Sequence, residues 1–583
     1  SKMKILLVAV DAKFIHTNLA VHSLKAYAGE YGKYIQIAQF SINNTKEEIL
    51  RGIYLEHADV VAFSCYIWNI SLILSVAENL KLVQPKVKIW LGGPEVSYHP
   101  KEFLIKYKEI DGIVVGEGER TFYELVRYYL GLDHDLADIK GIVYRESADI
   151  KVSGDEGDTE ITVTSLREPL PMDDIPFPYD DLTGLRNRII YYESSRGCPY
   201  GCSYCLSSAH RGVRFRSIDL VKKELKILLD NKVPQVKFVD RTFNCNKKHA
   251  MEIWRFIKEN DNGITNFHFE ITADLLGDEE LEFLKSLRPG LVQFEIGVQT
   301  TNPETIKAIN RTVDFKKLAE NVESIRKAHN IHQHLDLIAG LPLENYVSFE
   351  KSFNDVYRLK PDQLQLGFLK VLKGSLMEKD CKKYGIVCSN DPPYEVLFTD
   401  HISYDELLEL KGICNMVDVY YNSGQFAYSL EYMEYFFDSP MKMYLALYRY
   451  YEKKGLYTLE HSRIRRYEIL FEFFKDMVTA GNEKQDEVVG LFKEILVYDY
   501  CLREGLKNRP YFAGPPVEHQ KYKRILRELK IERSKAHIEN FTYDVIESVK
   551  AGKGVRKNCI ILFDYSVRDP ITRSATTRIA SEN

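Results

Sequence analysis

Residues 188–205 read RIIYYESSRGCPYGCSYC, in which an apolar, β-rich run is followed at once by a CxxxCxxC motif. The motif consists of Cys198, Cys202 and Cys205. In a chain with 10 cysteines among 583 residues, three cysteines at this spacing are expected by chance about 0.003 times. The motif therefore indicates a metal-ligating loop at the end of a strand. The other cysteines are scattered, and we expect them to be ordinary buried residues.

The chemistry of three thiolates on one loop favours an iron–sulfur cluster over zinc. Structural zinc usually takes four ligands with paired CxxC spacing, whereas three cysteines suit a 4Fe–4S cluster that leaves one iron open. The open iron can bind the amino and carboxylate groups of S-adenosylmethionine. One electron from the cluster then cleaves the sulfonium C–S bond and gives a 5′-deoxyadenosyl radical.

Alternating strand-like and helical segments continue from this motif toward the C-terminus. Strands are predicted at 188–197, 235–240, 266–272, 291–297, 332–340 and 363–370. Helical segments such as 218–231 separate them. Six βα repeats predict a full or partial parallel barrel over residues 188–378, with the chemistry at the carboxyl ends of its strands.

A second alternating pattern occupies residues 3–135. Strands are predicted there at 4–10, 35–42, 59–68, 86–93 and 111–119. Nearly continuous apolar strands separated by helices predict an α/β, doubly wound (Rossmann-like) domain with a parallel sheet covered on both faces. The ligand of such a fold binds beyond the carboxyl ends of the strands. Residues 136–187, rich in Pro and Asp, are predicted to be a linker that contains a small hairpin.

Residues 379–583 are predicted to form a mostly α-helical domain. Aromatic residues recur at helical spacing in 417–437 and 443–457. A packed bundle is the simpler interpretation, and an aromatic wall that faces the substrate is the alternative. Residues 501–583 carry 17 Lys and Arg against 10 Asp and Glu. This basic region could contact a phosphate-bearing partner, or it could form solvated helix faces.

The cysteine motif, with an aromatic residue before its last cysteine, resembles that of radical S-adenosylmethionine enzymes. The resemblance implies that successive barrel strand ends hold the amino group, ribose and adenine of the cofactor, with Tyr204 beside the adenine. The strand-end positions that would bind S-adenosylmethionine are Asp240, Arg241, Glu270, Glu295 and Gln299. The alternative for an acidic residue at such a position is to cap the following helix.

The N-terminal domain and the order of the domains resemble the cobalamin-binding subclass of that superfamily, over about residues 3–375. GGPEVS (92–97) and GEGE (116–119) carry this resemblance. The glycines let backbone approach a bulky planar ligand, and a glycine-bounded acidic turn supplies hydrogen bonds to amide side chains. The resemblance implies cobalamin contacts at Gly92, Gly93, Glu95, Gly116, Glu117 and Gly118.

The sequence departs from methionine-synthase-like domains where a lower cobalt ligand would be. Their DxHxxG motif puts a histidine below cobalt, whereas DAKFIHTN (11–18) has a different spacing and lacks the glycine. We expect His16 at a helix start or at the cofactor edge, with axial ligation as the alternative, and Asn18 among the cobalamin contacts. The loop at 64–69 is expected to cover the lower face and exclude water. Its expected contacts are Ser64, Tyr66 and Trp68, with plain packing as the alternative for Trp68.

The expected function is that of a cobalamin-dependent radical S-adenosylmethionine enzyme that methylates an unactivated carbon. By the resemblance, one S-adenosylmethionine remethylates cobalt, a second supplies the radical, and the substrate radical takes methyl from methylcobalamin. The alternatives are a cobalamin-assisted rearrangement, cyclisation or ring contraction, and a cobalamin or redox sensor. Methylthiotransferases carry three further N-terminal cysteines, where this chain has only Cys65, so that function is excluded.

The composition is typical of a cytoplasmic enzyme. The chain is 45% hydrophobic and 28% charged, with a net charge of −5 and a pI near 6.4, so it presents no strongly basic surface overall. No apolar run approaches the ~18–20 residues that span a bilayer, and no signal-peptide layout is recognisable. The expected partners are a small-molecule or peptide substrate and an electron donor such as flavodoxin or ferredoxin. A nucleic-acid partner depends only on the basic C-terminal region.

Overall fold

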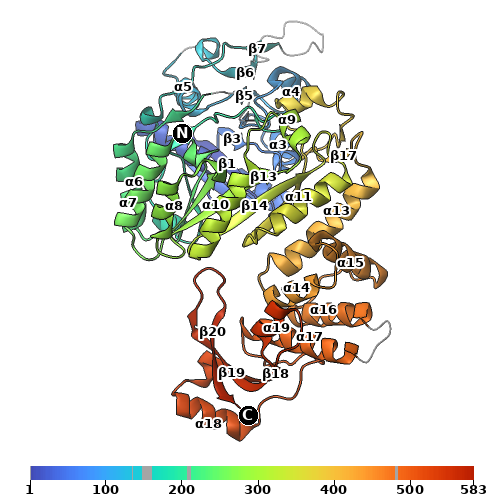
Figure 1. The fold of residues 1–583 in the computed structure, drawn as a ribbon. Helices are drawn as coiled ribbons and strands as arrows, with labels where there is room; N and C mark the ends of the chain where they lie inside the picture. The colour runs from blue at the N-terminus through green and yellow to red at the C-terminus, as the bar shows by residue number, and fades with distance from the viewer. Residues whose placement is uncertain (1, 134, 147–159, 207–211, 479–483, 583) are drawn as a thin grey trace.

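The computed structural model describes residues 2–133, 135–146, 160–206, 212–478 and 484–582. Figure 1 shows an N-terminal α/β part (blue) against a central α/β part (green to yellow), with a largely helical third part (orange to red) beneath them. Within these described ranges, no helix is both long enough and apolar enough to cross a membrane.

The N-terminal sheet has the strand order β2-β1-β3-β4-β5-β6-β7, and strands β1 to β5 run parallel. These five strands are β1 Ile5–Asp11, β2 Ile35–Ser41, β3 Val60–Ser64, β4 Lys88–Gly92 and β5 Gly112–Val114. The helices between and after them are α1 Leu19–Tyr27, α2 Lys46–Tyr54, α3 Ile70–Val83, α4 Pro100–Lys106 and α5 Glu119–Tyr129.

Helices cover both faces of this sheet. One hydrophobic core contains side chains of α2, α3 and α4, and a second core contains side chains of α1 and α5. Helix α2 begins at a capping box in which Thr45 and Glu48 accept each other's backbone amides. Because both faces are covered, β1 is buried at every position. The doubly wound prediction is therefore confirmed.

The segment 136–187, which the sequence predicts as a linker, contributes two strands to the same sheet. β6 Ile142–Arg145 pairs antiparallel with β5, and β7 Ile161–Val163 pairs antiparallel with β6. Side chains of β6 belong to both N-terminal cores, so the segment is anchored by burial rather than free. The acidic stretch at 153–160, except for Glu160, lies outside the described residues.

The central part contains an all-parallel sheet with the order β15-β14-β13-β12-β11-β8. Its strands are β8 Ile190–Tyr192, β11 Gln235–Phe238, β12 Asn266–Ile271, β13 Val292–Gln299, β14 His332–Ala339 and β15 Gln363–Phe368. Its helices include α6 Ile218–Asp230, α7 Lys247–Glu259, α8 Asp278–Lys285, α9 Pro303–Ala308, α10 Phe315–Ala328 and α11 Tyr346–Tyr357. The predicted partial barrel is confirmed.

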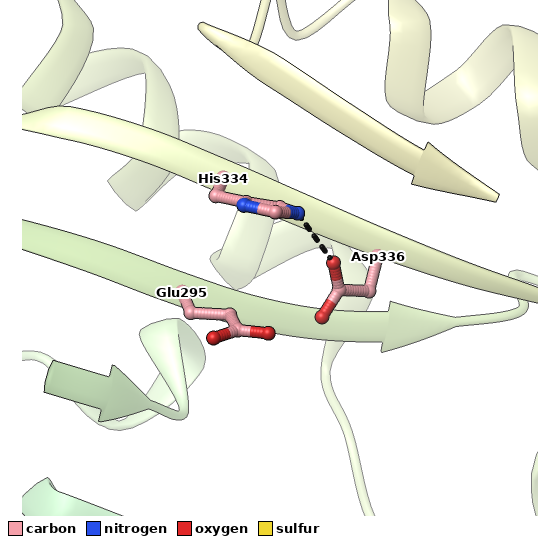
Figure 2. A group of neighbouring side chains, drawn as sticks. All are labelled: Glu295, His334 and Asp336. Atoms are coloured by element: carbon pink, nitrogen blue, oxygen red, sulfur yellow. Dashed lines mark ion pairs between the residues drawn. The ribbon is translucent and has the colours of Figure 1, made fainter. Parts of the chain in front are cut away.

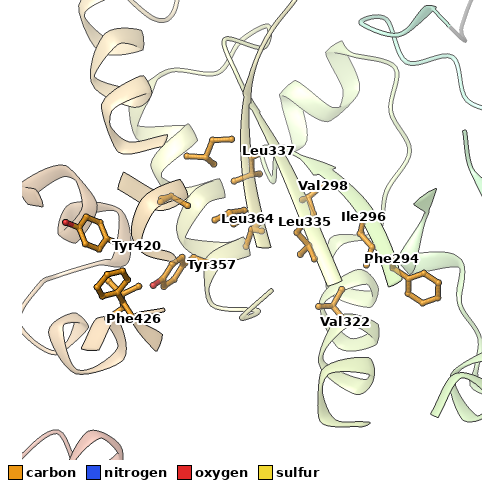
Figure 3. Close-up of a cluster of buried hydrophobic side chains, with 14 of the residues drawn as sticks. Phe294, Ile296, Val298, Val322, Leu335, Leu337, Tyr357, Leu364, Tyr420 and Phe426 are labelled. Carbon is orange, nitrogen blue, oxygen red and sulfur yellow. The ribbon is translucent and has the colours of Figure 1, made fainter. Parts of the chain in front are cut away.

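Side chains alternate along the barrel strands. In β13 and β14 every second residue is buried, and the residues between them are half-buried. The buried set, such as Phe294 and Leu335, packs in the core under the helices (Figure 3). The intervening set is mostly polar and lies on the other, concave face of the sheet. The barrel thus presents a polar inner surface.

The third part is a helical bundle with a small sheet at its far end (Figure 1). Its helices include α13 Tyr404–Met416, α14 Ala427–Glu434, α15 Pro440–Lys453, α16 Arg463–Val478, α17 Lys484–Cys501, α18 His519–Leu529 and α19 Val545–Ala551. The small antiparallel sheet consists of β18 Ala536–Tyr543, β19 Arg556–Arg568 and β20 Ala575–Glu582.

Several tyrosines of the third part are buried in its core, whereas others, such as Tyr435 and Tyr511, are exposed. Tyr420, Tyr432, Tyr444 and Tyr467 are among the most completely buried side chains. Their cluster is continuous with the barrel core, as Tyr420 and Leu364 show in Figure 3. For these residues the packed-bundle interpretation is confirmed.

Candidate functional site

A cavity of about 440 Å³ lies inside the N-terminal domain and reaches the barrel. Its inner part lies between the sheet and helices α1 and α5, and it is lined by the apolar residues Ile5, Leu7, Val60, Ala62, Trp90, Phe122, Leu125 and Val126. Its outer part lies at the carboxyl ends of the strands, where Ser64 and Gly118 meet Glu193 and Arg196 of the barrel. The cavity therefore suits a ligand with an apolar portion beside the sheet and a polar portion at the strand ends.

The turn after β4 needs glycine at one of its two positions. Gly93 has a φ of +109°, and a Cβ there would lie 2.5 Å from the Cys65 carbonyl oxygen. A Cβ on Gly92 would meet Val114 at an ordinary 3.7 Å. Only Gly93 thus allows the two loops at the mouth of the cavity to approach so closely.

Most of the residues expected to contact cobalamin line this cavity: Ser64, Tyr66, Gly92, Gly93, Gly116, Glu117 and Gly118. Asn18 instead caps α1, where its side chain accepts a hydrogen bond of 3.1 Å from the Val21 amide. Trp68 is 47% exposed and stacks on Tyr66, with the ring centroids 4.4 Å apart. Trp68 therefore reaches the cavity through Tyr66, and its role in covering a cofactor face stays a prediction.

Glu95 and His16, two further candidate residues, form hydrogen bonds with residues far away in the sequence. Glu95 is buried and accepts a hydrogen bond from the hydroxyl of Tyr394. Burial raises the pKa of Glu95, and the bond from Tyr394 partly offsets this. His16 is hydrogen-bonded through Nδ1 to the hydroxyl of Tyr191 on β8. Neither Glu95 nor His16 is among the described residues that line the cavity.

Arg196 connects the mouth of the cavity to the cysteine loop. It forms ion pairs with Glu119, with Glu193 and, at 3.5 Å, with Glu117, which also pairs with Arg214. Burial alone would raise the pKa of Glu119, but the charge of Arg196 lowers it below its usual value. The GEGE turn is therefore fixed to the barrel by arginines. Sequence reasoning missed this role, and the only signal was the position of Arg196 two residues before the cysteine motif.

The cysteine loop begins at a tight contact between two backbone segments. Gly197 has a φ of +95°, and a Cβ there would overlap the carbonyl of Gly212. Cys198 and Cys202 are buried and Cys205 is half-buried. The amide of Cys205 donates to the carbonyl of Cys202 at 3.1 Å, which closes a turn between the last two cysteines. The three thiols thus lie on one short, anchored loop.

Arg311 lies against this loop. Its Nη1 donates to the hydroxyl of Tyr204 at 2.8 Å, and its Nη2 donates to the carbonyl of Gly297 on β13. Burial raises the pKa of the Cys202 thiol, and the positive charge of Arg311 opposes that rise. A buried cation next to the thiols fits a group with net negative charge, such as a cluster held by three thiolates.

Asp240 is fully committed to bonds within the barrel. Its carboxylate accepts hydrogen bonds from the Ser194 amide at 2.8 Å, from the Ser194 hydroxyl at 2.5 Å and from the Ser195 hydroxyl at 2.7 Å. Burial raises the pKa of Asp240 to about 6, although the bonds from Ser194 lower it. Asp240 therefore positions the chain that leads to the cysteine loop, and its expected contact with S-adenosylmethionine stays a prediction.

Gln299 and Glu270 are placed at the concave side of the barrel. The Oε1 atom of Gln299 is buried without a hydrogen-bond partner among the described residues, so it can accept a bond from a ligand. Burial, with the nearby charge of Glu295, raises the pKa of Glu270 to about 7, and Arg241 partly opposes this. Both side chains are thus available to a polar ligand.

Three family models match successive parts of the chain. The B12 binding domain matches residues 5–126, the radical SAM superfamily matches 192–356, and a protein of unknown function (DUF4080) matches 382–575. The chain belongs to the cobalamin-dependent radical SAM family. Its cofactors are accordingly a 4Fe–4S cluster, S-adenosylmethionine and cobalamin.

Several curated proteins are similar to this radical SAM chain. An uncharacterized methyltransferase, PH0819, of Pyrococcus horikoshii is 27% identical over 306 residues, which are 50% of this chain and 62% of that protein. The cobalamin-dependent radical SAM methyltransferase TokK of Streptomyces tokunonensis is 27% identical over 50% of this chain and 44% of its own length. The chain thus spans about half the length of the curated relatives it matches.

Other comparisons extend this picture. Most of the matching curated proteins are methyltransferases by name, and the matches also include an anaerobic magnesium-protoporphyrin IX monomethyl ester cyclase of Synechocystis. The structure of the cobalamin-dependent S-adenosylmethionine radical enzyme OxsB shares the fold, with a TM-score of 0.55 at 15% identity, over 86% of this chain and 76% of that one.

The residues of this radical SAM enzyme fit its three cofactors. The thiols beside Arg311 suit the cluster, and the unpartnered oxygen of Gln299 suits a donor of S-adenosylmethionine. The apolar cavity beside the sheet suits a bulky ligand such as cobalamin, with its polar edge at the Gly93 and Gly118 turns. The individual ligand contacts stay predictions.

Proposed function

We propose that this radical SAM enzyme methylates an unactivated carbon of a small-molecule or peptide substrate. One observation carries the proposal: the cavity that suits cobalamin is lined on its barrel side by Glu193, Arg196 and Val239. Arg196 lies two residues before Cys198, and Val239 directly follows β11. The cobalamin-binding end and the cluster-binding loop therefore border one space.

The cofactors, when bound, supply a radical that abstracts hydrogen and a methyl group carried by cobalt. The residues of the chain hold the reacting groups close and keep water out. Tyr66 of the N-terminal domain interacts electrostatically with Arg241 of the barrel. Asp11 of the N-terminal domain likewise interacts with Tyr191 of the barrel. We infer that the substrate binds between these two sets of strand ends.

Electron supply is a second part of the proposal. We propose that a flavodoxin or ferredoxin delivers the electron that the cluster needs.

The alternative is radical cyclisation or rearrangement without net methylation. It is favoured by one specific observation, the similarity to a protein named as a cyclase. Both functions need the same cluster and cobalamin, so only the products separate them.

The test is anaerobic reconstitution of the full chain with iron, sulfide and cobalamin, followed by S-adenosylmethionine and a strong reductant. We expect 5′-deoxyadenosine, S-adenosylhomocysteine and methylcobalamin by mass spectrometry. Cys202→Ala should abolish 5′-deoxyadenosine, and the control Cys388→Ser should not. 5′-Deoxyadenosine without the other two products would contradict methyl transfer and favour cyclisation. Bound cobalamin with none of these products would favour a sensor.

A further inference from the structure

The concave face of the barrel carries a group of potential metal ligands well separated in sequence from the cysteine motif. Glu295 on β13 and His334 and Asp336 on β14 lie side by side, as Figure 2 shows. One ligand atom from each lies within 4.8 Å of the others. In the register of the parallel strands, Glu295 is opposite His334, and Gly297 is opposite Asp336. The alternation of the strands therefore turns all three side chains to the same face.

A fourth side chain on the neighbouring strand β12 is directed at this group. His268 is 9% exposed, and its Nε2 lies 3.4 Å from Oε2 of Glu295. This Nε2 is buried and has no hydrogen-bond partner in the described part of the chain. The contact with His268 lowers the pKa of Glu295, so this nitrogen interacts with the carboxylate although the separation is long for a hydrogen bond. We call these four side chains the barrel cluster: His268, Glu295, His334 and Asp336.

The spacing of the barrel cluster partly matches that of a metal site. Ligand atoms at 2.0–2.2 Å from a tetrahedral metal ion are about 3.3–3.6 Å apart. The His268–Glu295 separation is 3.4 Å, and Nε2 of His334 lies 3.0 Å from Oδ1 of Asp336. The first separation lies within this range, and the second is shorter, the length of a direct hydrogen bond.

Neighbouring amides hold the imidazoles in place. The side-chain amide of Gln293 lies 3.2 Å from Nδ1 of His268, and Gln365 Oε1 lies 3.1 Å from Nε2 of His334. The amide nitrogen of Gln293 is the atom next to Nδ1 of His268, so it donates to Nδ1, and the ring proton lies on Nε2, facing Glu295. A metal ion bound at this Nε2 would displace that proton. Gln365 contacts the same Nε2 of His334 that faces Asp336, so a metal ion at this nitrogen would replace the bond to Gln365.

The concave face brings together carboxylates and the positively charged groups that partly offset them. Glu270, Glu295 and Asp336 act on one another electrostatically. Burial raises the pKa of Asp336 to about 6, and the charge of Glu295 adds to this. Lys237 and Arg241 offset part of the negative charge at Glu270. Burial lowers the pKa of His334, but its hydrogen bond with Asp336 raises it overall, so this ring also offsets part of the negative charge.

We propose that Glu295, His334 and Asp336 bind one divalent first-row transition metal ion, with His268 beside Glu295 at the edge of the site. Mixed nitrogen and oxygen ligands suit Zn²⁺ and Mn²⁺ and are distinct from the thiolates of the cysteine loop. The competing interpretation is an internal network of ion pairs that needs no metal. This proposal can be tested separately from methyl transfer, because metal binding is measured without turnover.

The experiment uses the full chain loaded with its cluster and cobalamin and then dialysed against a chelator. Mn²⁺ is titrated, and the free ion is counted by electron paramagnetic resonance; Zn²⁺ is counted by elemental analysis. We expect one saturable Mn²⁺ or Zn²⁺ per chain. His334→Gln and Asp336→Asn should each weaken binding at least about 10-fold. Mn²⁺ prefers hard ligands, so the cysteines do not compete for it.

His332→Ala is the matched control. His332 lies on the same face of the same strand, two residues before His334, and its Nδ1 is also buried without a partner. We expect this variant to bind the ion as the unaltered chain does, with the same melting temperature and cluster absorbance in all variants. The proposal is overturned if the unaltered chain binds neither ion, or if the two cluster variants bind it as tightly as the control does.

Discussion

The two parallel sheets of this enzyme use the same strand arrangement for opposite purposes. In β1 of the N-terminal sheet every residue is buried, whereas in β13 of the barrel buried and half-buried residues alternate. The N-terminal sheet has helices on both faces, while the barrel leaves its concave face open to a ligand. The first sheet borders an apolar cavity, and the second presents carboxylates and imidazoles.

Because of this difference, the two sheets are expected to select their ligands by different physical means. An apolar cavity gains free energy from any bulky group that displaces water, so its selectivity comes from shape. A polar concave face must have its buried donors and acceptors paired, so its selectivity comes from bond geometry. The two surfaces meet at Arg196, where the comparison can be tested most strongly.

The largest effect on stability is expected at Arg196, where the two surfaces meet. Arg196→Met leaves the carboxylate of Glu119 buried without its cation, because the Glu119 side chain is only 6% exposed. The free energy of unfolding should fall by about 3–5 kcal/mol, measured by chemical denaturation. Arg120→Met is the control, since Arg120 is exposed and pairs with Glu124 on the same helix, a contact worth about 0–1 kcal/mol. Equal losses in both variants would show that the buried Arg196–Glu119 ion pair stabilises the fold no more than the exposed Arg120–Glu124 pair does.

The next effect concerns pH and the polar sheet. The pKa of Asp240 is about 6 in the folded protein, against 3.8 for an ordinary aspartate. The folded state therefore holds this proton more tightly than the unfolded chain. Its contribution to stability is complete below about pH 4 and is lost as the pH rises through about 6.

Asp240→Asn should remove this dependence. Relative to the unaltered chain, the variant should gain up to about 3 kcal/mol of unfolding free energy between about pH 4 and 7. Denaturation at several pH values checks this, and parallel curves for the two proteins would contradict it.

A smaller effect on stability is expected at the glycine turn after β4, which borders the apolar cavity. Gly93→Ala forces a side chain into a left-handed backbone position and against the Cys65 carbonyl. This should cost about 1–3 kcal/mol and lower cobalamin retention, measured by thermal melting and by absorbance after gel filtration. Gly92→Ala, whose Cβ has ordinary contacts, should melt close to the unaltered chain. The argument fails if Gly92→Ala proves the more damaging of the two.

The smallest effect is expected from a single bond on the barrel. Gln299→Leu removes the unpartnered amide oxygen and should weaken S-adenosylmethionine binding about 10-fold, the equivalent of one hydrogen bond. Calorimetry on the cluster-loaded chain measures this affinity. Gln293→Leu, on the same face of β13, should leave the affinity unchanged. An unaltered affinity in Gln299→Leu would remove that residue from the site.

The elements that sequence could predict are those with a local signal. The apolar run of β1 and the alternation of β13 are visible within single segments, and the cysteine motif occupies eight consecutive residues. The helical spacing of aromatics likewise predicted the packed bundle that buries Tyr420 and Tyr444. In each case one stretch of chain contains the whole pattern.

The elements that sequence missed depend on partners far away in the chain. The sequence predicts the hairpin within 136–187, but not that its first strand, 142–145, pairs with β5 and extends the N-terminal sheet. Arg196 acts on Glu119 across 77 positions, and His268 meets Glu295 only through the register of two strands. Asn18 could be read equally as a ligand contact or as a cap, because asparagine serves both roles at the start of a helix.

The bond between Tyr394 and Glu95 bears on how such enzymes are assembled from modules. Tyr394 belongs to the segment matched to DUF4080, yet its hydroxyl reaches the cobalamin-binding domain across 299 positions. A recombination event that replaced the C-terminal module would leave the buried carboxyl of Glu95 without this partner. The bond therefore couples the C-terminal module to the cobalamin-binding domain, although each has its own family model.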